Sequence, residues 1–148
     1  MSPRALLRRA RDYWAGLLAS PGGPGRVSRG MAAGAAAAML PAFGLHLVIA
    51  AALAWLLRGS LPVATAACLF IGNPLTHLFL LPLEFELGRR LVPPSLDLLP
   101  KHGPGWLLLL LPDAEGTLAG GLLLAFILGL AVLLLSRWSL RAKEAKPR

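Results

Sequence analysis

Two long stretches of the chain are almost purely apolar. Residues 30–57 and 117–136 contain no acidic or basic side chain except the titratable His46. A helix that crosses the hydrocarbon core of a bilayer needs about 20 apolar residues, and both stretches are long enough. A water-soluble fold of this size distributes charge over its whole surface instead. The pattern therefore predicts an all-α integral membrane protein with a transmembrane helix at 117–136.

The first apolar stretch is interrupted near its middle. Within residues 26–57, Pro41 removes a helical hydrogen bond and clashes with the preceding turn, and Gly44 weakens the helix further. Residues 30–40 are too few to cross a membrane before this break. Two shapes remain open: one kinked span, or a re-entrant pair of half-helices that returns to its starting side.

A second apolar segment, residues 61–83, repeats this plan. Gly72 and Pro74 interrupt it, and Pro74 pushes the preceding Asn73 away from the helical region. Irregular backbone survives at membrane depth only where protein or water covers it. Transporter binding sites are built from paired interrupted segments of this kind. The two breaks are therefore the candidate site for a polar solute or an ion.

Four polar side chains lie at these breaks. Asn73 and Thr76 can bind a ligand at membrane depth, or they can cap the half-helix that follows them. His46 can relay protons, or it can stay neutral and bond a backbone carbonyl that Pro41 exposes. His77 follows the second break, so it can pair with His46. Two histidines without a nearby carboxylate make a poor metal site, and we expect no metal and no cofactor.

The segment from Glu84 to Glu115 is polar and rich in proline, with a short apolar run at 106–111. Glu86 stands three residues before Arg89 and four before Arg90, so it can pair with either on a helix face. Such pairs are typical of a solvated interface and seldom catalytic. The lone Cys68 has no partner, and neither a Ser/His/Asp order nor a Gly-rich phosphate loop occurs. We therefore expect that the protein is not an enzyme.

Basic residues flank the apolar stretches and give the chain a net charge of +8. Residues 2–19 form a predicted amphipathic helix that lies in the membrane interface. Basic flanks of membrane segments are held in the cytoplasm and attract anionic lipid headgroups, which favours lipid over nucleic acid as the partner. The predicted headgroup contacts are Arg4, Arg8, Arg9, Arg11, Arg137 and Arg141.

The two basic ends constrain the topology. We expect both termini in the cytoplasm, so a multi-pass chain makes an even number of complete crossings. A re-entrant 26–57 then leaves 61–83 to cross outward and 117–136 to cross back. So few spans give little protein to cover broken backbone, so we expect a homo-oligomer. Gly30 and Gly34, four residues apart, are typical of close helix contacts in membranes.

Several motifs resemble those of the bacterial membrane family called domain of unknown function 2062. They are Pro41-x-Phe43-Gly44-Leu45-His46, Arg58-Gly59-x-x-Pro62, Gly72-Asn73-Pro74-x-Thr76 and Glu84-Phe85-Glu86-Leu87-Gly88. The resemblance covers about residues 20–92, and Phe70 stands where the family leads us to expect Trp. It implies a bacterial membrane protein, and it implies no reaction because the family is uncharacterised.

The sequence thus predicts five segments in a bacterial inner-membrane protein: an interfacial helix at 1–20, a membrane domain at 26–92, a loop at 93–116, the helix at 117–136 and a basic tail at 137–148. The predicted function is a polar solute or ion site, or a pathway, at the two breaks. The alternative is a non-transporting scaffold or lipid-interacting accessory protein. A transporter needs water at the breaks in at least one state, whereas a scaffold keeps them dry.

Overall fold

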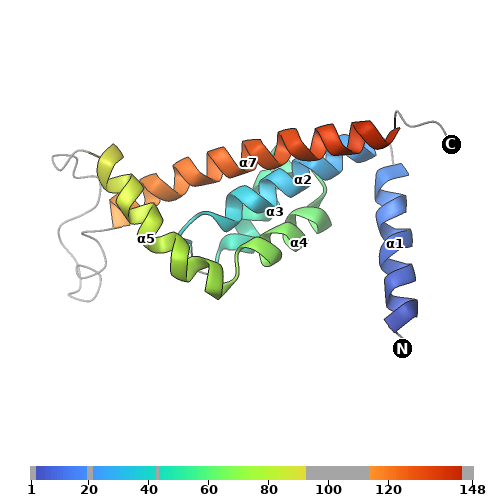
Figure 1. Cartoon of the computed structure of the whole chain (residues 1–148), viewed down its shortest axis with the longest axis horizontal. Coiled ribbons are helices and arrows are strands. Elements are labelled where there is room, and N and C mark those ends of the chain that lie inside the picture. The colour runs from blue at the N-terminus through green and yellow to red at the C-terminus, as the bar shows by residue number, and fades with distance from the viewer. Residues whose placement is uncertain (1–2, 20–21, 43, 93–113, 145–148) are drawn as a thin grey trace.

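The structure, a computed structural model, describes residues 3–19, 22–42, 44–92 and 114–144 (Figure 1). All regular secondary structure within these ranges is helical, which confirms the expectation of an all-α protein. The helices are α1 (Pro3–Ala19), α2 (Gly23–Ala38), α3 (His46–Leu56), α4 (Leu61–Ile71), α5 (Pro74–Leu91) and α7 (Ala114–Glu144).

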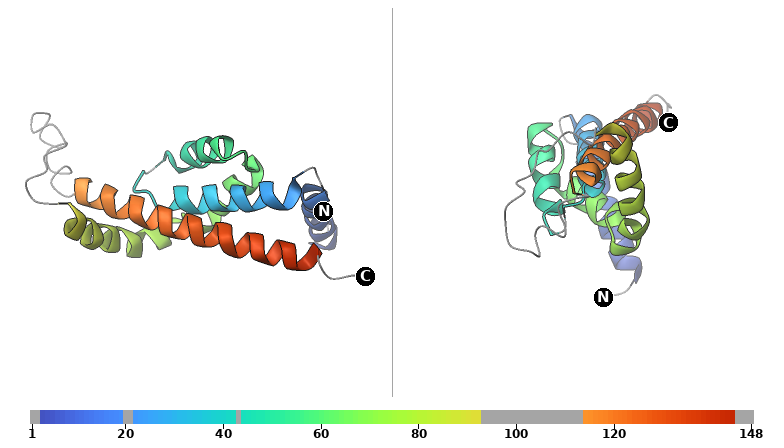
Figure 2. Two further views of the ribbon diagram at one scale, coloured as in Figure 1. Left: turned by 90° about the horizontal axis from the view of Figure 1, so that it is seen from above. Right: turned by 90° about the vertical axis from the view of Figure 1, so that its left-hand side faces the viewer.

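Helix α2 lies at the centre of the bundle, packed against α7, α4 and α3 (Figure 2). Helix α3 turns back from the end of α2, so the start of α2 and the end of α3 meet. The backbone N–H of Ser60 donates to the Arg26 carbonyl at 3.0 Å, and the Arg29 side chain donates to the Arg58 carbonyl at 3.1 Å. These bonds close α2 and α3 into a hairpin.

Helices α4 and α5 follow each other with a bend of 77° between them. Helix α5 then packs along α7, which runs back over the length of the bundle (Figure 1). Over Ala114–Leu140, α7 is long and apolar enough to cross a membrane, and the bent α4–α5 pair passes the same test when taken as one span. Only 22% of the most apolar window of α7 is buried within the chain, unlike the core helix of a soluble protein. This exposure supports membrane association.

Large apolar side chains cover much of the outer surface. Phe70 is 85% exposed, Trp55 77% and Phe79 71%. A monomeric soluble protein seldom exposes so many large apolar groups together, whereas a lipid-facing surface requires them. Helix α1 contacts α2 and runs across the direction of α2 and α7 at one end of the bundle (Figure 1).

Small residues let α2 approach its neighbours closely. A Cβ atom on Gly30 would lie 2.5 Å from the Ser60 carbonyl oxygen, and one on Gly34 would collide with the Ala64 carbonyl and lie 2.8 Å from Cβ of Ala67. The Gly30-x-x-x-Gly34 pair thus serves packing within the chain, between α2 and the start of α4. In lipid such packing relies on dispersion and not on water exclusion.

Two boundaries differ from the sequence-based expectation. Helix α7 covers 114–144 instead of 117–136. Hydropathy predicts only the apolar part of a helix that suits lipid, and the hydrogen-bonded helix continues into the polar residues at both ends. Helix α5 continues to Leu91, beyond the end of the apolar segment 61–83, so the polar residues 84–91 are helical as well. The apolar run at 106–111 and most of the predicted loop at 93–116 lie outside the described residues.

The α2–α4 contact generates a first prediction. Gly34→Ala places a methyl group where the α4 backbone lies, so we expect a loss of about 1–3 kcal/mol in the free energy of unfolding. Thermal unfolding in detergent measures this as a lower Tm. Gly16→Ala is the matched control, because Gly16 lies within α1 and has no atom within 4 Å of an added Cβ. An equal Tm for both variants would contradict the packing described above.

Candidate functional site

The first break extends from Met39 to Leu45, between α2 and α3. His46, the first residue of α3, places its ring Nε2 2.8 Å from the Leu40 carbonyl oxygen. The same oxygen accepts the backbone N–H of Ala42 at 2.8 Å. Because a carbonyl only accepts hydrogen bonds, Nε2 carries the proton in this contact and Nδ1 of a neutral ring is an acceptor. His46 thus anchors the backbone of the first break.

The second break is held by one amide. Asn73 is the N-cap of α5: its Oδ1 accepts the backbone N–H of Thr76 at 3.0 Å. Its Nδ2 donates to the Phe70 carbonyl in the last turn of α4 at 3.3 Å. One side chain therefore satisfies a donor at the start of α5 and an acceptor at the end of α4. Asn73 and the backbone of Thr76 serve the break as a cap.

The two breaks meet at the histidines. The His46 and His77 ring centroids are 4.8 Å apart, with the rings tilted by 42°, and His77 is only 5% exposed. Both rings line a pocket of about 390 Å³, within the range of small-molecule sites. The other lining residues are Gly72, Pro74, Leu78 and Leu81. Of the four residues predicted as ligands, the pocket brings together the two histidines, whereas Asn73 and Thr76 do not line it.

The donor set of this site does not favour a transition metal. Within the described ranges no three His, Cys, Asp or Glu side chains gather as metal ligands. The pocket is otherwise apolar, with two imidazoles as its polar groups. Such a lining suits a small polar solute that exchanges hydrogen bonds with the rings.

Glu84 is the polar residue that the sequence analysis missed. It follows His77 by seven residues on α5, which places both on one face of the helix. Its exposed fraction is 0%, and neither carboxylate oxygen has a hydrogen-bond partner among the described residues. The polar segment that begins at Glu84 predicts a solvated position for Glu84 as for Glu86, and the burial of Glu84 shows that this is wrong. Its spacing from His77 was the signal available in the sequence.

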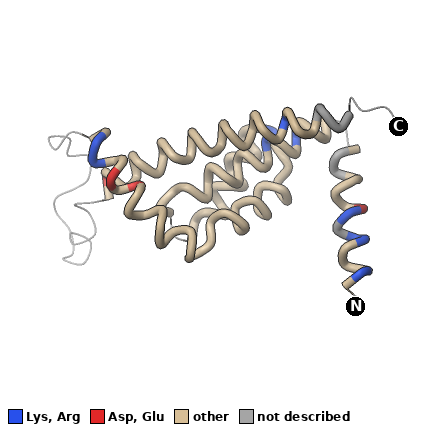
Figure 3. Tube along the Cα trace, in the orientation of Figure 1, with Lys and Arg blue, Asp and Glu red and all other residues tan. Residues whose placement is uncertain are grey.

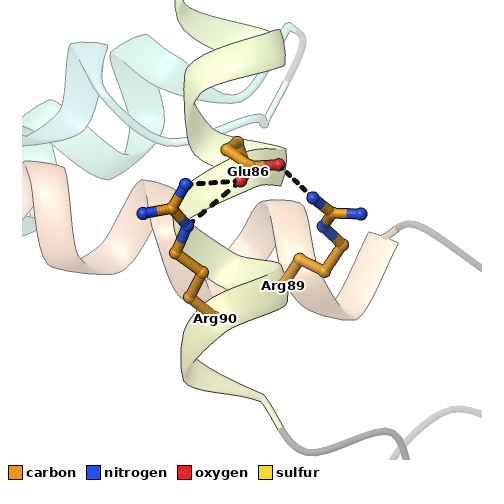
Figure 4. Close-up of polar contacts among 3 residues, drawn as sticks. All are labelled: Glu86, Arg89 and Arg90. Atoms are coloured by element: carbon orange, nitrogen blue, oxygen red, sulfur yellow. Dashed lines mark hydrogen bonds and ion pairs between the residues drawn. The ribbon is translucent and has the colours of Figure 1, made fainter.

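Glu86 behaves as the sequence analysis predicted. Its Oε2 lies 2.6 Å from Nη2 of Arg89, and its Oε1 accepts Nε and Nη2 of Arg90 at 3.0 and 2.8 Å (Figure 4). The three side chains are well exposed, and exposed ion pairs of this kind contribute little to stability. Glu86 therefore belongs to the polar end of α5 and not to the buried face that carries Glu84.

Basic residues gather along α1 and at the end of the bundle where α2 begins and α7 ends (Figure 3). Arg4, Arg8, Arg9 and Arg11 are exposed on α1, Arg137 is half-buried on α7, and the side chain of Arg141 lies outside the described residues. A groove of about 1030 Å³ opens at this end. Its lining includes three arginines and two large aromatics: Arg26, Arg29, Arg58, Tyr13 and Trp55. The sequence analysis did not single out this groove.

The cap at the second break generates a prediction. Asn73→Ala removes the acceptor for the Thr76 N–H, so we expect a loss of about 1 kcal/mol in the free energy of unfolding. Asn73→Ser keeps an acceptor at the N-cap and should recover most of this stability in thermal unfolding. If the serine variant is no more stable than the alanine variant, the cap is not the role of Asn73.

Comparison with known proteins identifies the family of this chain. The model of a family described as an uncharacterized protein conserved in bacteria, domain of unknown function 2062, matches residues 7–148. The match extends beyond residues 20–92, on which the resemblance in the sequence rests. No curated protein and no solved structure matches the chain. This chain belongs to the bacterial family named domain of unknown function 2062.

Proposed function

We propose that this protein is a small multi-pass protein of the bacterial inner membrane, not an enzyme, and that it binds a polar solute or ion where its two helix breaks meet. One observation carries the proposal: a pocket of about 390 Å³ is lined by both His46 and His77, each of which follows one of the breaks. The family match supports the bacterial source, and the exposed apolar surface of α7 supports the membrane.

The proposed topology has two complete crossings. Helices α2 and α3 form a re-entrant hairpin, α4 and α5 together cross outward, and α7 crosses back. The bond between Ser60 N–H and the Arg26 carbonyl supports the hairpin, because it joins the two ends of that element. The basic residues of α1 and of the end of α7 then lie in the cytoplasm, as membrane proteins prefer.

The pocket offers both hydrogen-bonding roles. His46 donates its Nε2–H to the Leu40 carbonyl, so its neutral ring carries Nδ1 as a hydrogen-bond acceptor. The nearby His77 ring adds a second pair of nitrogens at a site of low exposure. Side chains on the outer surface around the breaks, such as Phe70 and Phe79, then face lipid or further copies of the chain in a homo-oligomer.

A lipid-interacting accessory protein is the second candidate, and the groove at the basic end favours it. Arg26, Arg29 and Arg58 can hold the phosphate of an anionic headgroup, while Tyr13 and Trp55 lie beside them as interfacial aromatics do. Arg58 adopts the left-handed conformation (φ 52°). The Arg29 side chain, which donates to the Arg58 carbonyl, ties the two arginines together. A protein with this lipid-interacting function excludes water from the pocket that His46 and His77 line.

Thiol labelling distinguishes the two functions. In a Cys68→Ala background, Leu81→Cys places a thiol in the pocket lining, and Phe79→Cys places one on the outer apolar surface of the same helix. A membrane-impermeant maleimide is applied to each side of sealed vesicles. We expect Leu81→Cys to be labelled from at least one side, because water must enter a solute site, and Phe79→Cys to stay unlabelled.

Size-exclusion chromatography in detergent first checks that both variants are folded. Labelling of Leu81→Cys alone supports a solute or ion site and identifies the side to which it opens. If a folded Leu81→Cys resists the reagent from both sides, as the lipid-facing control does, the solute site is excluded and the lipid-interacting function takes its place.

A further inference from the structure

We propose that Glu84, together with the Met39 carbonyl at the end of α2, forms a binding site for an alkali-metal cation at the first helix break. The site lies where α5, α7 and the end of α2 converge. It differs from the pocket that the two histidines line, because Glu84 is not among the lining residues of that pocket.

The position of the carboxyl group carries the argument. Glu84 is one of the largest side chains that the structure buries completely. Its backbone lies against α7, where a Cβ atom on Gly120 would collide with the Glu84 carbonyl. On the adjacent Gly121, a Cβ atom would lie 3.6 Å from the Glu84 carboxyl carbon and 3.0 Å from the Met39 carbonyl oxygen. The carboxyl group thus points into the junction and toward the first break.

Gly121 has no Cβ atom, and this lets α7 approach the first break closely. A carbon atom there would also lie 2.7 Å from Cδ of Pro41, too close for any side chain. The carboxyl group of Glu84 on α5 and the Met39 carbonyl oxygen at the end of α2 therefore both lie close to the same residue of α7. Oxygen atoms of carboxylate and backbone carbonyl groups are the ligands that hard cations prefer.

A buried carboxyl group keeps its negative charge only where a positive partner compensates it. Burial of an unpaired charge costs several kcal/mol, and no Lys or Arg of the described chain forms an ion pair with Glu84. A bound cation would supply the missing charge and coordinate the two oxygen atoms that lack hydrogen-bond donors. The carboxylate then becomes a ligand and not an uncompensated charge.

The end of α2 adds negative potential at the same place. The last carbonyl groups of a helix lack intrahelical donors and carry the negative end of the helix dipole. In transporters with interrupted helices, such half-helix ends and unwound carbonyls coordinate Na⁺. A single carboxylate suits a monovalent ion, since the described residues hold no cluster of three acidic or histidine ligands for a divalent one.

The cation site does not depend on water entering the histidine pocket. A protein whose pocket stays dry can still bind a cation at Glu84, and a wet pocket does not require one. Failure of either experiment therefore leaves the other interpretable.

The test compares thermal unfolding of the purified full-length protein in NaCl or KCl with unfolding in choline chloride, at constant pH and ionic strength. A ligand that binds only the folded state raises Tm, and we expect a rise of about 4 °C or more in one of the metal salts. Glu84→Gln should abolish the rise. Glu86→Gln, which alters an exposed carboxylate two residues along the same helix, should retain it.

Equal Tm values for the wild type in all three salts would overturn the proposal, and so would an unchanged rise in Glu84→Gln. If Glu84→Gln fails to fold, binding of ²²Na⁺ and ⁸⁶Rb⁺ to the wild type and to Glu86→Gln decides the question. Saturable binding of either ion to both proteins is expected, and its absence from the wild type contradicts the site.

Discussion

The close approach of α2 to α4 and α7 determines how the other helices are arranged. Gly30 and Gly34 meet the α4 side without side chains of their own, and Gly129 of α7 would place a Cβ atom 3.1 Å from Ala36 on α2. Between these contacts the core is made largely of alanines. Helices that pack this closely gain dispersion contacts over their whole length, which is the main source of association in lipid.

A short central helix also imposes a constraint on its end. Helix α2 stops at Ala38, inside the bundle, so its last carbonyl groups need partners that water would otherwise supply. His46 provides one at Leu40, and Asn73 does the same for Phe70 at the second break. His46 therefore stabilises the first break and also lines the pocket. In this way the requirement to satisfy broken backbone brings polar side chains to both breaks.

Local sequence signals predicted the elements well. Pro41 and Pro74 indicate interruptions because proline lacks an N–H, and the apolar run of α7 indicates a helix suited to lipid. The motifs around these breaks also pointed to the family. For Asn73 the sequence left capping and ligand binding open, since an amide suits both, and only the geometry assigns its bonds to the backbone.

Tertiary contacts decided what the sequence did not reveal. Burial of Glu84 depends on Gly120 and Gly121, which lie far along the chain on α7 and allow α5 to approach closely. A prediction based on local polarity alone groups Glu84 with the exposed Glu86, two residues further along the chain. The basic groove has the same origin, because Arg58 joins Arg26 and Arg29 only when α3 returns to the start of α2.

Helix α3 returns to the side on which α2 begins, and the proposed topology depends on this return. Cysteine labelling of intact cells and inverted vesicles tests it most directly. Arg26→Cys, Arg58→Cys and Arg90→Cys, each in a Cys68→Ala background, place thiols at exposed positions at the start of α2, after α3 and near the end of α5. Two crossings predict that positions 26 and 58 are labelled from the cytoplasmic side and position 90 from the opposite side. Labelling of positions 26 and 58 from opposite sides would contradict the re-entrant hairpin and the account built on it.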